Sequence, residues 1–267
     1  MLIIGERLNT SRKQFREMFD NREQNLDAIR ALIKSQVDAG ANYLDVNVGT
    51  RVTTEVEDLV WLAKFTQETV DIPLSIDTPN PKAAEAALKV HKGRPIINSI
   101  SLEEKRYNGM ISLVKQYKAG VIALCLDDVG MPETVEDKVK NAKRLVERLN
   151  KDGVNNEDIY LDPLVQPIST DTKFAIQTVE AIKRIREMFS DVHISCGVSN
   201  VSYGLPKRLF INQAFIVMCI AAGMDTGIID PNDEVTMRNI WAAEALTDKD
   251  PFCAQWLELF RAGRLGA

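Results

Sequence analysis

Short apolar runs rich in β-branched residues recur along the whole chain, and their starts are separated by roughly 20 to 40 residues. The runs are nearly continuous in their apolar character, which is typical of parallel strands that are covered on both faces. The predicted strands cover residues 2–6, 42–48, 73–78, 95–100, 120–126, 159–164, 193–200 and 227–231. Their spacing is that of a repeated strand–helix unit.

The segments between these runs show helical periodicity. Apolar side chains fall on one face of residues 26–37, 135–149 and 179–189. Glycines at four predicted helix ends favour left-handed caps: Gly40, Gly93, Gly120 and Gly223. Eight such units without a linker predict one domain over residues 1–267, a (β/α)8 TIM barrel. A doubly wound open sheet is less favoured, because the chain contains neither GxGxxG nor GxxxxGK[ST].

Composition narrows the class of protein. Hydrophobic residues make up 45% and charged residues 27%, and the net charge is -5, which gives no electrostatic reason to expect nucleic acid or an anionic membrane as partner. No stretch approaches the ~20 apolar residues of a membrane span, and the start does not resemble a signal peptide. We therefore expect a cytoplasmic protein.

Cysteine and histidine are scarce and scattered. Cys125, Cys196 and Cys219 lie in apolar segments and are expected to be buried free thiols. The chain has two histidines, which argues against most His-based metal sites and against a Ser-His-Asp triad. No bound metal is expected.

Nearly every predicted strand ends in a carboxylate or a carboxamide. Closure of a barrel brings these ends around one mouth, where enzymes of this fold have their active sites. The residues are Glu6, Asn47, Asp77, Asn98, Asp127 with Asp128, Asp162, Asn200 and Asp230. Capping of the following helix explains any one of them about as well as function does. Together they suit a neutral heterocycle with amino, amide and carbonyl groups on its edge, such as a pterin, better than a phosphate.

Five motifs resemble one family: GERLNTSR, SIDTPNP, INSIS, YLDPLVQPIS and GVSNVSYGLP. The chain is similar, from Gly5 to the closing FRAGRL, to the methyltetrahydrofolate:corrinoid methyltransferases among the pterin-binding TIM barrels. The resemblance implies methyl transfer between N5 of methyltetrahydrofolate and the cobalt of a corrinoid (cobalamin). That corrinoid belongs to a separate protein, either a corrinoid iron–sulfur protein or the corrinoid protein of a demethylation system. A homodimer is also implied.

The resemblance assigns roles to four residues. Asp77, Asn98 and Asp162 correspond to the residues that bind the pterin, and Asn200 corresponds to the asparagine at N5. Asn200 is expected to be catalytic by donating a hydrogen bond that strengthens as the methyl departs, an effect of roughly 3–4 kcal/mol. Strand termination explains Asn200 less well once the motif is considered. The chain has neither a zinc-type Cys/His cluster nor a DxHxxG-type corrinoid loop, so the corrinoid is expected on a partner.

Other residues are further candidates for the mouth: Glu6, Asn9, Asp45, Asn47, Asp128, Arg208 and Asp230. A structural role explains Asp45 equally well, and a pair between Arg7 and Glu6 would explain those two residues. Arg208 suits the glutamate tail of folate or the docking partner, although a solvated helix start is slightly favoured.

Two alternatives remain open. A dihydropteroate synthase would share the pterin contacts, but its NxTPDSFSxGG loop and basic SxR segment are missing here. A non-catalytic module that binds pterin or a corrinoid protein is the other alternative. The sequence also leaves open the direction of methyl transfer, the pathway and the proton source for N5.

Overall fold

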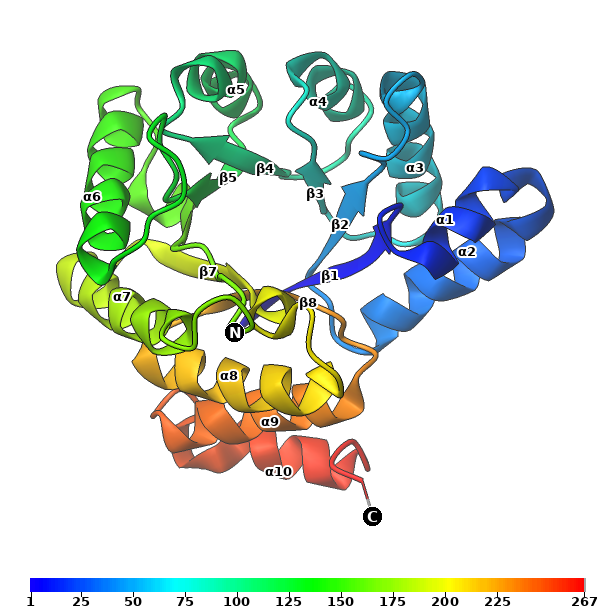
Figure 1. The fold of residues 1–267 in the computed structure, drawn as a ribbon. Coiled ribbons are helices and arrows are strands. Elements are labelled where there is room, and N and C mark those ends of the chain that lie inside the picture. The colour runs from blue at the N-terminus through cyan, green and yellow to red at the C-terminus, as the bar shows by residue number, and fades with distance from the viewer. Residues whose placement is uncertain (267) are drawn as a thin grey trace.

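The computed structural model describes residues 1–266 and contains a closed barrel of eight parallel strands in chain order, seen end-on in Figure 1. Pairing of the first strand with both the second and the eighth closes the barrel. The strands are β1 (Leu2–Asn9), β2 (Tyr43–Asn47), β3 (Leu74–Asp77), β4 (Ile96–Ser101), β5 (Gly120–Leu124), β6 (Ile159–Asp162), β7 (His193–Gly197) and β8 (Thr226–Ile229). The predicted TIM barrel is confirmed.

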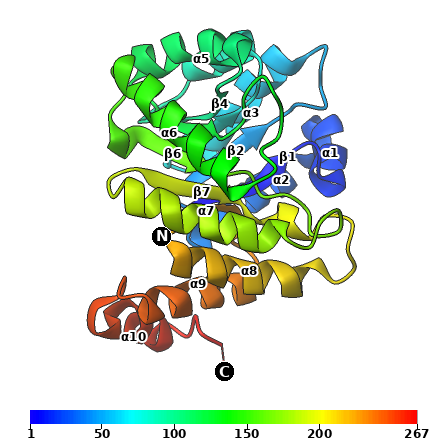
Figure 2. The same cartoon turned by 60° about the vertical axis from the view of Figure 1, so that its left-hand side comes forward.

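Helices surround the barrel on its outside (Figure 1). They are α1 (Lys13–Asp20), α2 (Arg22–Asp38), α3 (Glu55–Thr69), α4 (Pro81–Leu88), α5 (Glu104–Tyr117), α6 (Val135–Lys151), α7 (Phe174–Met188), α8 (Arg208–Ala222), α9 (Glu234–Leu246) and α10 (Ala254–Arg261). The predicted periodic segments coincide with α2, α6 and α7. Figure 2 shows α10 stacked outside α9. Within residues 1–266, no helix has both the length and the apolar character that crossing a bilayer requires.

Apolar packing occurs on both sides of the strands. The larger core lies between the strands and the helices, and it includes the free thiols of Cys125, Cys196 and Cys219, as predicted. A smaller cluster fills the barrel itself: Ile4, Ile96, Ile122 and Tyr160. Alternate strand residues point to the same side. Two residues beyond Ile96 and Tyr160 stand Asn98 and Asp162, which places both on the inner side at the mouth.

The prediction that Gly120 caps a helix end was wrong. Gly40 and Gly223 do follow helix ends, with φ of 112° and 117°, as expected. Lys118 ends α5 in the left-handed conformation, and Gly120 is the first residue of β5. A Cβ at Gly120 would lie 2.9 Å from Cε2 of Tyr160. Glycine is required there by close packing inside the barrel and not by a turn.

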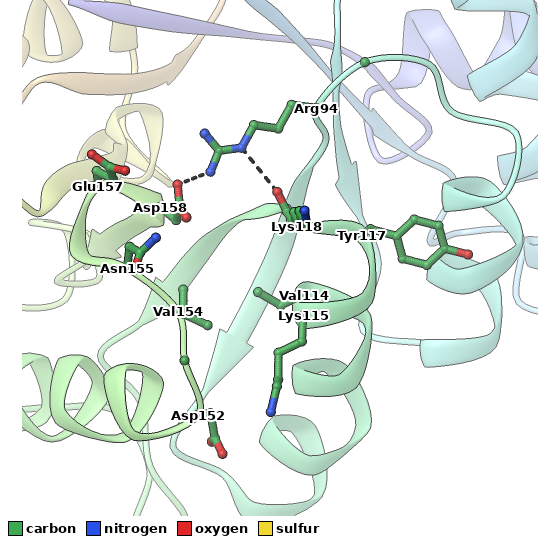
Figure 3. A pocket seen from close by; sticks show the side chains of 13 residues that line it. Arg94, Val114, Lys115, Tyr117, Lys118, Asp152, Val154, Asn155, Glu157 and Asp158 are labelled. Atoms are coloured by element: carbon green, nitrogen blue, oxygen red, sulfur yellow. Dashed lines mark hydrogen bonds and ion pairs between the residues drawn. The ribbon is translucent and has the colours of Figure 1, made fainter.

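The end of the barrel opposite the mouth carries a groove of about 780 Å3, shown in Figure 3. Its walls come from the segments that precede β4, β5 and β6. Arg94 crosses it, donating from Nε to the Lys118 carbonyl at 3.2 Å and forming an ion pair with Asp158. In TIM barrels this end usually contributes to stability, whereas the active site lies at the other end.

Asp225 joins three elements at the same end. Its carboxylate accepts hydrogen bonds from the Arg186 guanidinium at 2.9 Å and from the Ile194 amide at 2.9 Å, and it lies 3.1 Å from Nδ1 of His193. Burial alone would raise the pKa of Asp225. The hydrogen bonds from His193 and Ile194 and the charge of Arg186 outweigh burial and hold that pKa below its usual value. The ionised carboxylate therefore stabilises the folded state.

We expect Asp225→Ala to lower the free energy of unfolding at pH 7 by about 2 kcal/mol, because it leaves buried donors unpaired. The depressed pKa means that this stabilisation is complete above the unfolded-state pKa of about 4 and disappears as the pH falls through the folded-state value. Urea unfolding of both proteins between pH 7 and pH 3.5 measures it. Asp27→Ala, at a fully exposed side chain, is the control and should have little effect. An equal loss from both variants would contradict this role.

Candidate active site

The mouth contains a cavity of about 690 Å3 on the side formed by β1, β7, β8 and α8. Six polar residues of its lining are Glu6, Asn9, Arg12, Asn200, Arg208 and Asp230. Five of these six were predicted for the mouth. They come from strand ends and loops that are far apart in the sequence, so closure of the barrel assembles this part of the site.

Neighbouring strand ends hold two of the expected pterin-binding side chains. Asn47, at the end of β2, donates from Nδ2 to Oδ2 of Asp77 at 2.7 Å. Asn98, on β4, donates from Nδ2 to Oδ1 of Asp45 at 3.1 Å, and both side chains are buried. Asp77 and Asn98 are therefore each held by a partner on β2.

Asp45 and Asp77 form a coupled pair of carboxyl groups. Burial is the main reason that the pKa of Asp45 lies well above its usual value, and the negative charge of Asp77 raises it further. Burial also raises the pKa of Asp77, although hydrogen bonds from Asn47 and Asp45 and the charge of Arg106 oppose that effect. The pKa values of both carboxyl groups are therefore raised, and Asn47 and Arg106 favour the charged form of Asp77.

Asp162 ends β6 and is buried. Burial raises the pKa of Asp162 to about 6, and hydrogen bonds from the Leu164 and Gly197 amides and the charge of Lys138 act in the opposite direction. The Leu164 amide donates to Oδ1 at 2.8 Å. Asp162 is therefore mostly ionised at neutral pH, and its carboxylate can accept paired hydrogen bonds from a ligand with adjacent donors.

The structure pairs the charged residues of the first strand differently from the sequence prediction. Glu6 forms its ion pair with Arg12, and Arg7 pairs with Asp230 at 3.2 Å. The register of β1 is irregular between Gly5 and Leu8, and Arg12 rather than Arg7 is the ion-pair partner of Glu6. Burial raises the pKa of Glu6 and Arg12 lowers it, with a net upward direction. The charge of Glu6 also raises the pKa of Asp45, which shows that these groups share the mouth.

Asn200 lies in the short 3-10 helix Val198–Ser202, which directly follows β7. Its backbone carbonyl accepts from the Tyr203 amide at 3.1 Å, but within residues 1–266 its side-chain amide has no hydrogen-bond partner. Arg208 donates to the Ser202 hydroxyl at 3.0 Å and also to the Ser199 carbonyl. Arg208 therefore holds the segment around Asn200 and leaves the amide of Asn200 available to a ligand.

Two further candidates make local contacts. Asn9 lines the cavity, and its Oδ1 accepts from the Ser11 amide at 2.9 Å in the turn before α1. Asp128 is exposed in the loop before α6, and its contact is with the Glu104 amide at 3.4 Å, at the start of α5. The observed contact of Asp128 is thus of the helix-capping kind.

Three charged residues of the site were missed from the sequence. Arg12 is the ion-pair partner of Glu6, Arg106 lowers the pKa of Asp77, and Lys138 lowers that of Asp162. Arg12 stands inside the GERLNTSR motif, six residues after Glu6, but the sequence does not tell which arginine pairs with Glu6. Arg106 had no visible marker, because it is on α5 whereas Asp77 ends β3. Lys138 did have a visible marker in the sequence. It stands three residues after Val135 and four before Ala142, within the apolar stripe of its helix.

Comparison with known proteins agrees with this geometry. The family model described as "Pterin binding enzyme" matches residues 5–230. A methylcorrinoid:tetrahydrofolate methyltransferase from Eubacterium limosum is 34% identical over 268 residues, covering 100% of this chain and 98% of that protein. Methionine synthase from Mycobacterium tuberculosis is 31% identical over 90% of this chain, which matches 21% of that longer protein.

Solved structures agree in fold. Dihydropteroate synthase from Coxiella burnetii superposes with a TM-score of 0.70 at 15% identity, covering 92% of this chain and 93% of that one. The Yersinia pestis enzyme gives 0.67 at 15% identity, covering 92% and 93%. At this identity the likeness concerns the barrel alone. The family match spans both expected pterin carboxylates, and the chain belongs to the pterin-binding enzymes.

Proposed function

We propose that this protein is a methyltransferase that moves a methyl group between N5 of methyltetrahydrofolate and the cobalt of a corrinoid on a separate protein. The match to the Eubacterium limosum methyltransferase carries this assignment most strongly, because it extends over nearly all of both chains. That relative's name gives a methylcorrinoid as donor and tetrahydrofolate as acceptor, and we propose the same direction here. The dihydropteroate synthase likeness is limited to the fold, so it favours that alternative less.

The strand-end residues suit the edge of a pterin. Asp162, ionised above about pH 6, would accept from the 2-amino group and an adjacent ring N–H. Asp77, held by Asn47, would accept a further donor, and Asn98 offers both a donor and an acceptor. A ring without these donors would leave buried carboxylate oxygens unpaired, at a cost of about 1–3 kcal/mol each.

Asn200 would act on the reacting atom. In transfer from folate, the N5–methyl bond breaks, the methyl joins the reduced cobalt of the partner, and N5 retains the electron pair and takes up a proton. A hydrogen bond from the Asn200 amide stabilises the electron density that builds on N5 as the methyl leaves. In the opposite direction the carboxamide oxygen of Asn200 would accept from N5–H, which leaves the N5 lone pair free to attack the incoming methyl group.

The surroundings of the mouth support docking of a protein partner. Large apolar side chains remain exposed beyond three strand ends: Val52 and Val129, in the loops after β2 and β5, are 81% and 96% exposed, and Phe210, in the first turn of α8, is 72% exposed. These side chains offer apolar contacts to a protein that docks over the mouth. They would meet the protein that carries the corrinoid.

The homodimer and the cytoplasmic location implied earlier remain part of the proposal. Near the end of the chain Leu246, Phe252 and Phe260 are 83%, 98% and 68% exposed. A second copy covering this face would bury them. Light scattering of the purified protein at micromolar concentration tests the dimer, and a monomeric mass would exclude it.

Methyl transfer is tested by an anaerobic assay of purified protein with methyltetrahydrofolate and free cob(I)alamin, and with methylcobalamin and tetrahydrofolate. We expect the absorbance change of methylcobalamin formation or loss in the two assays. Asn200→Ala should slow transfer about 100- to 1,000-fold while changing the folate Kd only slightly, because its hydrogen bond strengthens in the transition state. Asn25→Ala on the outer helix α2 is the control. Folate binding without transfer to free or protein-bound corrinoid would favour a non-catalytic module or another pterin reaction.

Folate binding should depend on ionised Asp162. We expect the methyltetrahydrofolate Kd to rise as the pH falls through about 6, since protonated Asp162 cannot accept two hydrogen bonds. Asp162→Asn should weaken binding about tenfold or more at pH 8. Calorimetric titration from pH 5 to 8 measures both, and the ratio of the two Kd values removes ionisation of the ligand itself. A ratio independent of pH would show that Asp162 does not bind the pterin in its ionised form.

A further inference from the structure

Lys138 is a lysine with no exposed surface on the inner side of α6. Its Nζ donates to the Pro163 carbonyl at 2.7 Å, to the Leu164 carbonyl at 2.6 Å and to Oε1 of Gln166 at 3.2 Å. These bonds use all three donors of an ammonium group. A buried lysine is costly to desolvate, so such complete pairing indicates a specific position for the loop that it holds.

That loop begins directly after Asp162. Leu164 has φ of 63°, in the left-handed region that is unfavourable for a side chain with a branched Cγ. Its carbonyl accepts from Lys138 while its amide donates to Oδ1 of Asp162 at 2.8 Å. The ammonium and the carboxylate are therefore connected through the two polar groups of a single residue.

The charge of Lys138 is a second connection between this residue and Asp162. The positive charge of Lys138 lowers the pKa of Asp162, opposing the effect of burial. The other titratable groups that act here are the thiols of Cys125 on the β5 side and Cys196 on β7. Burial raises the pKa of Cys125, and a hydrogen bond with Cys219 together with burial raises that of Cys196. Both thiols therefore remain neutral across the range in which Asp162 titrates.

We propose that Lys138 is a positioning residue for pterin binding, which fixes the loop after β6 and thereby the orientation of the Asp162 carboxylate. This inference rests on the proposed function, which assigns Asp162 to the pterin. Lys138 has no contact with the ligand in this role. It acts through Leu164 and through its charge.

Lys138→Met tests the role, because methionine fills similar volume without donors or charge. We expect the Kd for methyltetrahydrofolate at pH 8 to rise about tenfold, as Asp162 loses its fixed orientation. The pH at which binding weakens should also move upward from about 6, since the opposing positive charge is gone. Calorimetry from pH 5 to 8 measures both, and Lys138→Gln, which keeps a donor but no charge, replaces the methionine variant if that one does not fold.

Two further variants separate positioning from general stability. Lys138→Arg keeps the charge and should leave the pH midpoint of binding near the wild-type value. Lys249→Met removes a lysine that is exposed but also donates to a backbone carbonyl, that of Met224 at 2.9 Å, away from the mouth, and it should leave folate binding unchanged. A lower melting temperature with an unchanged Kd and pH midpoint in Lys138→Met overturns the role of Lys138. Failure of the wild type to bind folate overturns the proposed function and this role together.

Discussion

Burial of carboxylates at the ends of the strands is the constraint on which the rest of the mouth depends. Desolvation favours the neutral form of a carboxyl group, and it raises the pKa of Asp45, Asp77 and Asp162 alike. The three groups differ in what opposes this effect. Asp162 has a lysine charge and two backbone amides, Asp77 has Asn47 and a more distant arginine, and Asp45 has no cation among its principal neighbours. Asp45 is also the one of the three whose pKa the neighbouring carboxyl groups of Asp77 and Glu6 raise further.

The two ends of the barrel use similar polar and charged side chains for different purposes, stability at one end and ligand binding at the mouth. At the end opposite the mouth, the Asp225 carboxylate is paired with Arg186, His193 and a backbone amide, and in its ionised form it stabilises the fold. At the mouth the exposed side-chain amide of Asn200 forms no hydrogen bond within residues 1–266, and Asp45 lies near the like charge of Asp77. The Asn200 amide therefore keeps its hydrogen-bonding capacity for a ligand. The groove of Figure 3, although it is similar in volume to the mouth cavity, is crossed by the ion pair between Arg94 and Asp158.

The sequence predicts the barrel well because its periodicity is local. Each strand such as 95–100 is a short apolar run, and each helix such as 135–149 shows its own stripe, so eight units are visible without knowledge of contacts. Strand ends were found for the same reason. Gly120 was misassigned because its requirement comes from Tyr160, on the next strand, and not from the neighbouring helix end. Pairings across units are invisible in one sequence, and the partner of Glu6 could not be told from the adjacent arginines.

Under the proposed function, an asparagine beside N5, rather than an acid, would suit a reaction that can run in either direction. A carboxamide can both donate and accept a hydrogen bond without titrating in the physiological pH range, whereas an acid would favour the demethylated, protonated side of the reaction. The raised pKa values of Glu6 and Asp45 show that the mouth does contain proton-binding groups, but they lie on β1 and β2. Asn200 is supplied by the turn after β7, where Arg208 fixes the backbone and leaves the amide free. Under the proposed function, the group that contacts N5 is thus separate from the titratable groups, so that pH would act on binding through Asp162 and not through Asn200.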